Sequence, residues 1–330
     1  MMKAVVVTQY QDTPRYLEVK PTVAQSDSML VKVSGVAISQ LARLQASGKH
    51  YVRHIPPFVA GVDGVGHLED GTKVYFLSAH SPVGAMAEYV NVAPELLITL
   101  PTELDLHLAA AIANPGMSSW AALTERTQLA QGETVLINGA TGASGRLAIQ
   151  IAKHLGAAHI IATGRSEKHR NDLLALGADE YLVMDEQLTD FSQQLQRVFK
   201  HGVDVVLDYL WGEPAACVLS QAKYAQQDDA ARRIRFINVG SLAGAELNLS
   251  ANAIRSSGVE LMGAGFGSLS NAALVRAIRN LLHSVAALDL KIDYQVHVAA
   301  DVEHIWNINS PSRIVLTFGN RESLISPAPE

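Results

Sequence analysis

The stretch Val135-Leu-Ile-Asn-Gly-Ala-Thr-Gly-Ala-Ser-Gly145, followed by the helical sequence of residues 146–155, decides the fold. Apolar residues with strand character lead into a turn of small residues, and the turn leads into a helix. Gly142 has no side chain to keep a pyrophosphate away, Gly145 lets the helix lie close to the strand, and the first N–H groups of the helix point toward the ligand. The pattern Ala140-x-Gly-x-x-Gly145 therefore predicts a dinucleotide-binding turn, and an ordinary tight strand-to-helix connection is the alternative.

The residues after this turn continue in the order that a dinucleotide-binding domain requires. The helix has one apolar face, and Gly156 is placed to end it. Further short apolar strands are predicted at residues 159–163, 181–183, 203–208, 235–239 and 259–263, with helices predicted at residues 167–176 and 189–200. Six strands that alternate with helices predict an α/β fold with a doubly wound, parallel, six-stranded sheet.

Composition limits the classes of protein to consider. The 330 residues are enough for two domains, and a hydrophobic content of 48% is enough for two cores. The net charge of −6 and the lack of a basic stripe argue against nucleic acid or an anionic membrane as a partner. The opening residues 1–7 are expected to form a strand rather than a signal segment. The single cysteine, Cys217, fits a cytoplasmic protein and is expected to pack in a helix rather than act as a nucleophile.

The chain is predicted to form two domains, one of them discontinuous. Residues 1–115 have short strand-like runs punctuated by proline and glycine, which predicts a mainly β domain. The nucleotide-binding domain is expected to cover residues 116–266, and strand-like runs in residues 267–330 are expected to return to the first domain. A helix is expected to be capped by Ser270, and residues 225–233 are expected to be a solvated loop or helix end.

The residues after the second strand predict the choice of cofactor. An NAD-preferring site has an acidic residue about 20 positions after the glycine turn, where this chain has Gly164. Arg165, Ser166 and Lys168 follow, and a guanidinium group suits the 2′-phosphate of NADPH. These residues predict NADPH as the cofactor; the alternative is that they are solvated charges at a helix start.

Other cofactor contacts are predicted from position alone. Ligands bind at the carboxyl ends of strands in such sheets, so the contacts are expected in the glycine turn and in the loops after the fourth, fifth and sixth strands. The residues concerned are Thr141, Gly142, Ala143, Ser144, Gly145, Tyr209, Asn238, Gly240, Ser241, Gly265 and Phe266. Ordinary loop residues, and for Tyr209 a place in the core, are the alternatives.

Several segments together resemble the medium-chain dehydrogenase/reductase superfamily and, within it, the zinc-independent quinone oxidoreductase-like branch. They include Pro57-Phe-Val-Ala-Gly-Val-Asp-Gly-Val-Gly66, Gly84-Ala-Met-Ala-Glu-Tyr-Val90, Gly116-Met-Ser-Ser-Trp-Ala-Ala-Leu123 and the glycine turn. The resemblance implies a GroES-like, mainly β catalytic domain, a Rossmann domain and a homodimer. Zinc-dependent members have a cysteine where this chain has Ala37 and a histidine where it has Val62, so no metal is expected.

The resemblance also implies positions for the nicotinamide and the substrate. It places Asn114 and Ser118 near the nicotinamide. Arg313 corresponds to a position that is often basic in the family, so it is expected to reach the cofactor, with a surface charge as the alternative. The candidate catalytic or substrate residues are Ser39, Gln40, Tyr51 and Asp63. A packing role for Tyr51 and a structural turn carboxylate for Asp63 are the alternatives.

The predicted function is hydride transfer from NADPH to a quinone or an α,β-unsaturated carbonyl compound, because such acceptors are electron-poor without help from zinc. A zinc-independent alcohol or acyl-CoA-linked dehydrogenase is one alternative. A cofactor-binding protein with a structural or regulatory role and little turnover is another, since the polar motif of related quinone reductases is not reproduced in residues 37–40. The partner is expected to be a small-molecule substrate.

Overall fold

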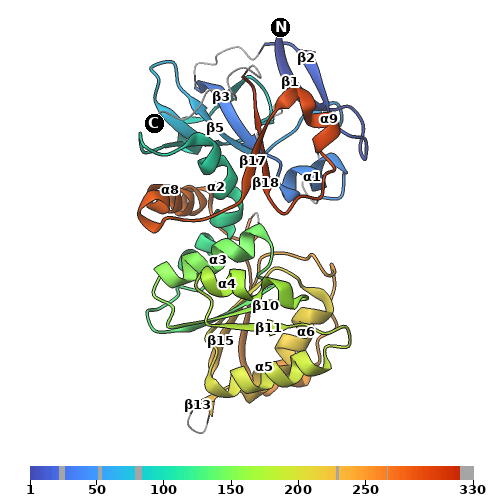
Figure 1. The fold of residues 1–330 in the computed structure, drawn as a ribbon, viewed down its shortest axis with the longest axis vertical. Coiled ribbons are helices and arrows are strands. Elements are labelled where there is room, and N and C mark those ends of the chain that lie inside the picture. The colour runs from blue at the N-terminus through green and yellow to red at the C-terminus, as the bar shows by residue number, and fades with distance from the viewer. Residues whose placement is uncertain (22–26, 51–53, 79–83, 228–229, 266, 320–330) are drawn as a thin grey trace. The chain divides into compact units, whose positions relative to one another are not determined.

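A computed structural model describes residues 1–21, 27–50, 54–78, 84–227, 230–265 and 267–319. The chain divides into two compact units, one made of Met1–Asn114 with Leu282–Glu330 and the other of Pro115–Leu281. Figure 1 shows the first unit rich in strands and the second unit as a sheet with helices. Helices α2 (Leu106–Ala121) and α8 (Asn271–Leu288) each contain the point where one unit ends and the other begins.

The first unit is built from two sheets. A three-stranded sheet has the order β2-β1-β4, and a larger sheet has the order β17-β18-β3-β5-β6-β8, with β7 paired to β3. The strands are β1 (Met2–Val7), β2 (Arg15–Val19), β3 (Met29–Ala37), β4 (Phe58–Val59), β5 (Asp63–His67), β6 (Lys73–Leu77), β7 (Tyr89–Val92), β8 (Leu97–Thr99), β17 (Tyr294–Val298) and β18 (Arg313–Thr317). Its short helices are α1 (Gln40–Ala46), η1 (Pro94–Leu96), η5 (Ala299–Asp301) and α9 (Val302–Ile305). One apolar core joins residues of β1, β3 and β18, so both ends of the described chain contribute to it.

The second unit contains the predicted parallel sheet. Its six strands have the order β11-β10-β9-β12-β15-β16, and every neighbouring pair is parallel. The strands are β9 (Thr134–Asn138), β10 (His159–Gly164), β11 (Glu180–Val183), β12 (Val205–Asp208), β15 (Arg233–Asn238) and β16 (Gly258–Gly263). In chain order this is 3-2-1-4-5-6, the Rossmann order, and the order reverses between β9 and β12. The predicted fold class is confirmed.

Helices cover both faces of this sheet. They are α3 (Ala143–His154), α4 (Arg170–Ala175), α5 (Thr189–His201), α6 (Gly212–Gln221) and α7 (Ala251–Arg255), with the shorter turns η2 (Ala122–Arg126), η3 (Glu167–His169) and η4 (Ala222–Tyr224). Leu136, Val206 and Phe236 face one another in register and pack with apolar residues of α5 and α6. Val135 and Ile137, the chain neighbours of Leu136, point to the opposite face of the sheet. They are also fully buried, as a strand covered on both faces requires.

Some local predictions hold and others are wrong. Ser270 caps α8, because its Oγ accepts the N–H of Ala273 at 3.2 Å. The single helix expected at residues 167–176 is instead η3 followed by α4. The loop expected at residues 225–233 contains two short antiparallel strands, β13 (Gln226–Gln227) and β14 (Ala230–Ala231). The polar sequence did not reveal this strand pair, because the exposed strand β14 has no apolar face to bury.

Candidate functional site

The glycine turn lies between β9 and α3, at the point where the strand order reverses. Gly142 is the residue before α3, with φ −80° and ψ 171°, and no side chain caps the first N–H groups of the helix. A Cβ added at Gly142 would meet no atom within 4 Å, whereas one added at Gly145 would lie 2.5 Å from Ala140 Cα. Thr141, Ala143 and Ser144 are the other members of the turn. The turn is therefore open where a pyrophosphate would lie and closed where the helix packs on the strand.

A buried network of hydrogen bonds joins the carboxyl ends of four strands beneath this turn. Asn138 Nδ2 donates to Asp208 Oδ1 at 2.8 Å, and Asn238 Nδ2 donates to Asp208 Oδ2 at 3.1 Å. Thr163 Oγ1 donates to Asn138 Oδ1 at 3.0 Å and accepts the N–H of Gly139 at the same distance. The network fixes the first residue of the glycine turn to the neighbouring strands.

The same carboxylate also holds the loop that follows β12. The N–H groups of Leu210 and Trp211 donate to Asp208 at 3.2 and 3.1 Å. Trp211 has φ +56°, a left-handed conformation that costs free energy in a bulky residue, and this hydrogen bond helps to hold it. The Leu210 side chain fills the space beside Gly139, where a Cβ would come within 2.8 Å of it. Burial raises the pKa of Asp208, and the hydrogen bonds that it accepts act against this rise.

The predicted phosphate-binding residues follow β10. Gly164 is the last residue of this strand. Arg165 and Lys168 are exposed, and Ser166 is half-buried. No hydrogen bond or ion pair joins the Arg165 guanidinium to another residue of the described ranges, so its donors are available to a ligand.

Arg146, which the sequence analysis did not name, adds a cation beside the turn. Its Nε donates to the carbonyl oxygen of Thr141 at 3.2 Å, and its Nη2 lies 3.2 Å from Asp172 Oδ2. Burial lowers the pKa of His169, the charges of Lys168 and Arg146 lower it further, and Asp172 opposes this. Arg146 directly follows Gly145, the last glycine of the turn, and this position was the sequence signal that could have identified it.

Arg170 does not belong to this group. It forms a two-point pair with Glu167, one bond of which is 3.1 Å, and its Nη1 donates to the carbonyl oxygen of Tyr181 at 3.1 Å. The guanidinium group is thus already engaged by protein acceptors.

Residues of α2 and the loop after β12 surround the start of α3. Tyr209 is buried, and its hydroxyl lies 2.8 Å from Ser119 Oγ, which donates to the carbonyl oxygen of Ser144 at 3.2 Å. Burial raises the pKa of Tyr209 to about 12. Ser118 Oγ is engaged with a backbone carbonyl of its own helix, and Asn114 is half-buried in α2. Contacts of Asn114, Ser118 and Tyr209 with the cofactor stay predictions.

The loops after β15 and β16 lie at the same edge of the sheet as the turn. Asn238 Nδ2 donates to the carbonyl oxygen of Gly240 at 2.7 Å, so the loop after β15 folds back on its own strand. Ser241 and Gly265 are exposed, and Phe266 lies outside the described residues.

In the first unit, the predicted substrate residues lie where β3 ends and β5 begins. Ser39 is buried, and its Oγ accepts the N–H of Ala42 at 3.0 Å as the cap of α1. Gln40 is exposed, and Asp63 is buried as the first residue of β5. Tyr51 lies outside the described residues. The Ser39 oxygen therefore has a structural role that the sequence analysis did not foresee.

Asp63 takes part in a buried charge cluster with Arg313. Its Oδ2 accepts the hydroxyl of Tyr75 at 3.0 Å, and its Oδ1 has no hydrogen-bond partner among the described residues. Arg313 Nη1 lies 3.4 Å from the carbonyl oxygen of Ile38, while its Nε and Nη2 are buried without such a partner. The alternative prediction, that Arg313 is a charge on the surface, is therefore wrong. Burial lowers the pKa of Arg313, the Asp63 carboxylate opposes this, and Arg43 adds to the lowering.

Comparisons with known proteins agree with this geometry. A family model described as "Zinc-binding dehydrogenase" matches residues 143–273. A probable NADPH-dependent quinone reductase of Emericella nidulans is 27% identical, over 96% of this chain and 99% of that protein. The quinone oxidoreductase of Sus scrofa is 29% identical over 57% of this chain and 59% of its own length. The chain is therefore similar to members of the medium-chain dehydrogenase/reductase superfamily.

A solved structure supports the same fold. The quinone oxidoreductase of Thermus thermophilus, also solved in complex with NADPH, is 23% identical and matches with a TM-score of 0.79 over 96% of this chain and all of that one. The resemblance to the quinone oxidoreductase-like branch is confirmed. A GroES-like β unit and a Rossmann unit are the corresponding parts of the chain.

The described residues meet neither the requirements of a metal-binding cluster nor those of a membrane-spanning helix. They form no group of three or more His, Cys, Asp or Glu side chains that is able to hold a metal ion. Ala37 and Val62 are both buried apolar residues. Within the same ranges, no helix has both the length and the hydropathy of a bilayer-spanning segment.

The buried carboxyl of Asp63 predicts a dependence of stability on pH. Burial raises its pKa to about 6, with Tyr75 and Arg313 opposing the rise. The folded state then binds more protons than the unfolded state between about pH 4 and pH 6, so Asp63 lowers the free energy of unfolding as the pH rises, by up to about 3 kcal/mol. Asp63→Asn removes this titration. Urea unfolding at pH 4.5 and pH 7.5 is expected to show the variant gaining stability relative to the wild type at the higher pH; an equal difference at both pH values contradicts the prediction.

Proposed function

We propose that this protein is an NADPH-dependent oxidoreductase of the medium-chain dehydrogenase/reductase superfamily that transfers hydride to quinones or α,β-unsaturated carbonyl compounds. The observation that carries the proposal is the open glycine turn at the strand-order reversal, with an uncapped helix behind it. The relatives from Emericella nidulans and Sus scrofa are described as quinone reductases, the first of them NADPH-dependent.

The residues present fit NADPH. The N–H groups of residues 143–145 hold the pyrophosphate, because they have no side-chain cap and Gly142 leaves the space beside them open. Arg165 and Lys168, with the Ser166 hydroxyl, hold the 2′-phosphate, since no carboxylate stands at Gly164 to repel it. The nicotinamide supplies the hydride when it is bound.

The substrate residues are proposed from the first unit. Gln40 is exposed and offers an amide donor to a substrate oxygen, and the Ser39 hydroxyl keeps its proton for donation while its oxygen caps α1. The buried side chains of Asp63 and Arg313 contribute to the electrostatic potential of the proposed substrate site. Tyr51 stays a proposed hydrogen-bond donor. We propose that zinc takes no part in the hydride transfer.

The reaction itself provides the test. We expect absorbance of NADPH at 340 nm to fall when p-benzoquinone or a simple enone is added to the enzyme. An alcohol or acyl-CoA-linked dehydrogenase would instead reduce NADP⁺ with an alcohol or acyl-CoA substrate, and neither relative is described in that way. A protein that binds NADPH but oxidises it with no quinone, enone or aldehyde would be the structural or regulatory alternative.

We also propose that the protein is a cytoplasmic homodimer. Burial raises the pKa of the Cys217 thiol to about 11, so the thiol stays protonated, as suits a reduced compartment. Strand β16 is the last strand of its sheet, and its residue Leu261 is 44% exposed, which leaves an edge for a second copy. Analytical ultracentrifugation tests the dimer.

The Asp208 network predicts that affinity for NADPH depends on a carboxylate which does not touch the ligand. Asp208→Asn presents an NH₂ group to the amide donors of Asn138 or Asn238, so we expect the glycine turn to loosen and the dissociation constant of NADPH to rise about tenfold. Isothermal titration calorimetry measures this change.

The matched control is Asp204→Asn. Asp204 precedes the same strand at its opposite end and accepts hydrogen bonds from Thr134 N–H and Arg232 Nε, at 2.9 and 2.8 Å. This variant is expected to lose stability and keep the wild-type affinity for NADPH. Equal affinities in the two variants contradict a specific role for Asp208.

A further inference from the structure

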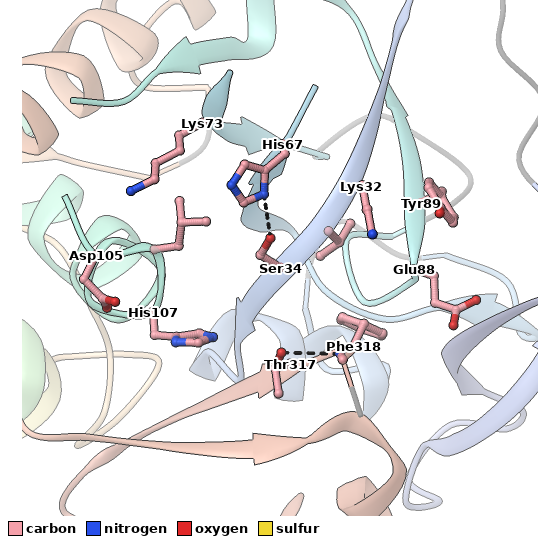
Figure 2. A pocket seen from close by; sticks show the side chains of 13 residues that line it. Lys32, Ser34, His67, Lys73, Glu88, Tyr89, Asp105, His107, Thr317 and Phe318 are labelled. Atoms are coloured by element: carbon pink, nitrogen blue, oxygen red, sulfur yellow. Dashed lines mark hydrogen bonds between the residues drawn. The ribbon is translucent and has the colours of Figure 1, made fainter. Parts of the chain in front are cut away.

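The first unit contains a cavity that none of the predicted site residues line. Its volume is about 640 Å³, within the range of small-molecule sites. Figure 2 shows polar side chains from β3, β5 and the start of α2 around it, with Thr317 and Phe318 at its lower rim. Leu106, Tyr89 and Phe318 supply apolar and aromatic surface.

A row of directly paired residues crosses one face of the sheet in this cavity. Tyr89 on β7 is opposite Lys32 on β3, Lys32 is opposite His67 on β5, and His67 is opposite Lys73 on β6. Residues opposite one another share a face of the sheet, so two lysines flank one histidine. The two lysines lie two strands apart on this face, with the histidine between them. Lysine and histidine side chains offer N–H donors to a ligand that carries oxygen acceptors.

The two carboxylates in the wall are engaged elsewhere. Asp105 Oδ1 accepts the N–H of Leu108 at 2.7 Å and the hydroxyl of Tyr294 at 3.3 Å. Glu88 Oε2 accepts the backbone N–H of Lys3 at 2.8 Å. Neither carboxylate forms a salt bridge with a lysine of the cavity among the described residues.

Several nitrogen donors are left for a ligand. Lys73 Nζ donates to the carbonyl oxygens of Thr102 and Leu104, at 2.6 and 3.1 Å, which leaves one of its three protons. His67 Nδ1 lies 3.1 Å from Ser34 Oγ, so its Nε2 remains. Within the described ranges, no hydrogen bond or ion pair joins the side chains of Lys32 or His107 to the protein.

Glycine allows one of these donors to lie against the sheet. A Cβ at Gly35 would come within 3.3 Å of His107 Cδ2, so the imidazole ring packs directly over the backbone of β3. The described part of the chain offers no third His, Cys, Asp or Glu that would make a metal site with the two histidines, and the lysines oppose a cation. The chemistry of the cavity is that of an anion site with apolar walls.

We propose that this cavity binds a small organic anion, with its oxyanion group held by Lys32, His67 and His107 and its apolar body against Leu106 and Phe318. The site is separate from the residues proposed for NADPH. A phosphate ester and a carboxylate share the required chemistry, and the probes below distinguish them.

Calorimetry with phenyl phosphate, benzoate and inorganic phosphate tests this proposal. Titrations are done at constant ionic strength and with saturating NADPH, so that the phosphate sites of the glycine turn are filled. We expect phenyl phosphate or benzoate to bind with a dissociation constant of about 1 mM or below, and inorganic phosphate, which lacks an apolar body, to bind at least about tenfold more weakly. The tighter of the two aromatic probes identifies the oxyanion.

Variants show where the probe binds. Lys32→Gln and His107→Gln are each expected to weaken binding of the aromatic anion by about tenfold. Lys20→Gln removes the same charge from an exposed lysine outside the cavity and is expected to have no effect. The proposal is overturned if the wild type shows no binding at about 10 mM, or if all three variants bind as the wild type does. Binding of the aromatic anion by a protein that does not bind NADPH would overturn the proposed function and leave this site standing.

Discussion

Gly142→Val is expected to weaken binding of both NADPH and NADH by at least about a hundredfold, or 2.7 kcal/mol, while the protein stays folded. The φ and ψ of Gly142 suit any residue, and a Cβ there meets no atom of the protein within 4 Å. The added side chain therefore costs the fold only about 1 kcal/mol, the cost of an apolar residue before a helix, but it fills the space where the pyrophosphate would lie. Calorimetry measures the affinity, and thermal unfolding measures the stability.

Gly145→Ala is the matched comparison. For this variant we expect the larger direct effect on the stability of the protein and not on its contact with the nucleotide. Its Cβ would lie 2.5 Å from Ala140 Cα and 2.7 Å from the carbonyl oxygen of Gly139, which are backbone atoms that cannot turn away. We expect a loss of about 3 kcal/mol in the free energy of unfolding, with weaker nucleotide binding as a consequence. Wild-type affinity in Gly142→Val would show that the pyrophosphate does not bind at this turn.

Arg165→Ala is expected to weaken NADPH binding by about 10- to 100-fold and NADH binding by less than about twofold. The guanidinium group is exposed and no described residue pairs with it, so its loss removes a contact to the 2′-phosphate without breaking one within the protein. The two dissociation constants, measured at low and high salt, check this expectation, since the difference should shrink as salt screens the charge.

Arg279→Ala controls for the general effect of removing a positive charge. Arg279 is an exposed arginine of α8. Its replacement is expected to change neither affinity. An equal loss of affinity for NADPH and NADH in Arg165→Ala would mean that the Arg165 side chain does not bind the 2′-phosphate.

The strands of the second unit could be predicted because each is a short apolar run buried on both faces. Leu136 and Val206 show why, since runs that pack on helices from two sides need no polar residue inside them. The Asp208 network was missed, although polar residues end β9, β12 and β15 at Asn138, Asp208 and Asn238. Their pairing depends on the order of strands in the sheet, which hydrophobic periodicity does not contain.

Other differences come from side chains that have two possible partners. Ser39 was predicted as a substrate contact, but its oxygen caps α1, and a serine before a helix start was a readable signal for that role. Arg170 follows Glu167 by three positions, which is the spacing of an ion pair on a helix surface, and it forms that pair. Arg313 was expected at the cofactor or the surface; its burial beside Asp63 depends on β18 lying next to β3, a contact between residues far apart in the sequence.

The position of β18 beside β3 has a consequence for how the chain is made. The strands of the second unit all lie within Pro115–Leu281, so a ribosome delivers that sheet complete. Strand β3 is translated before the second unit, yet one of its neighbours, Arg313–Thr317, is translated after that unit. The edge of β3 that pairs with β18 therefore stays unpaired until the second unit has been translated, and the second unit is free to fold before the first unit is complete.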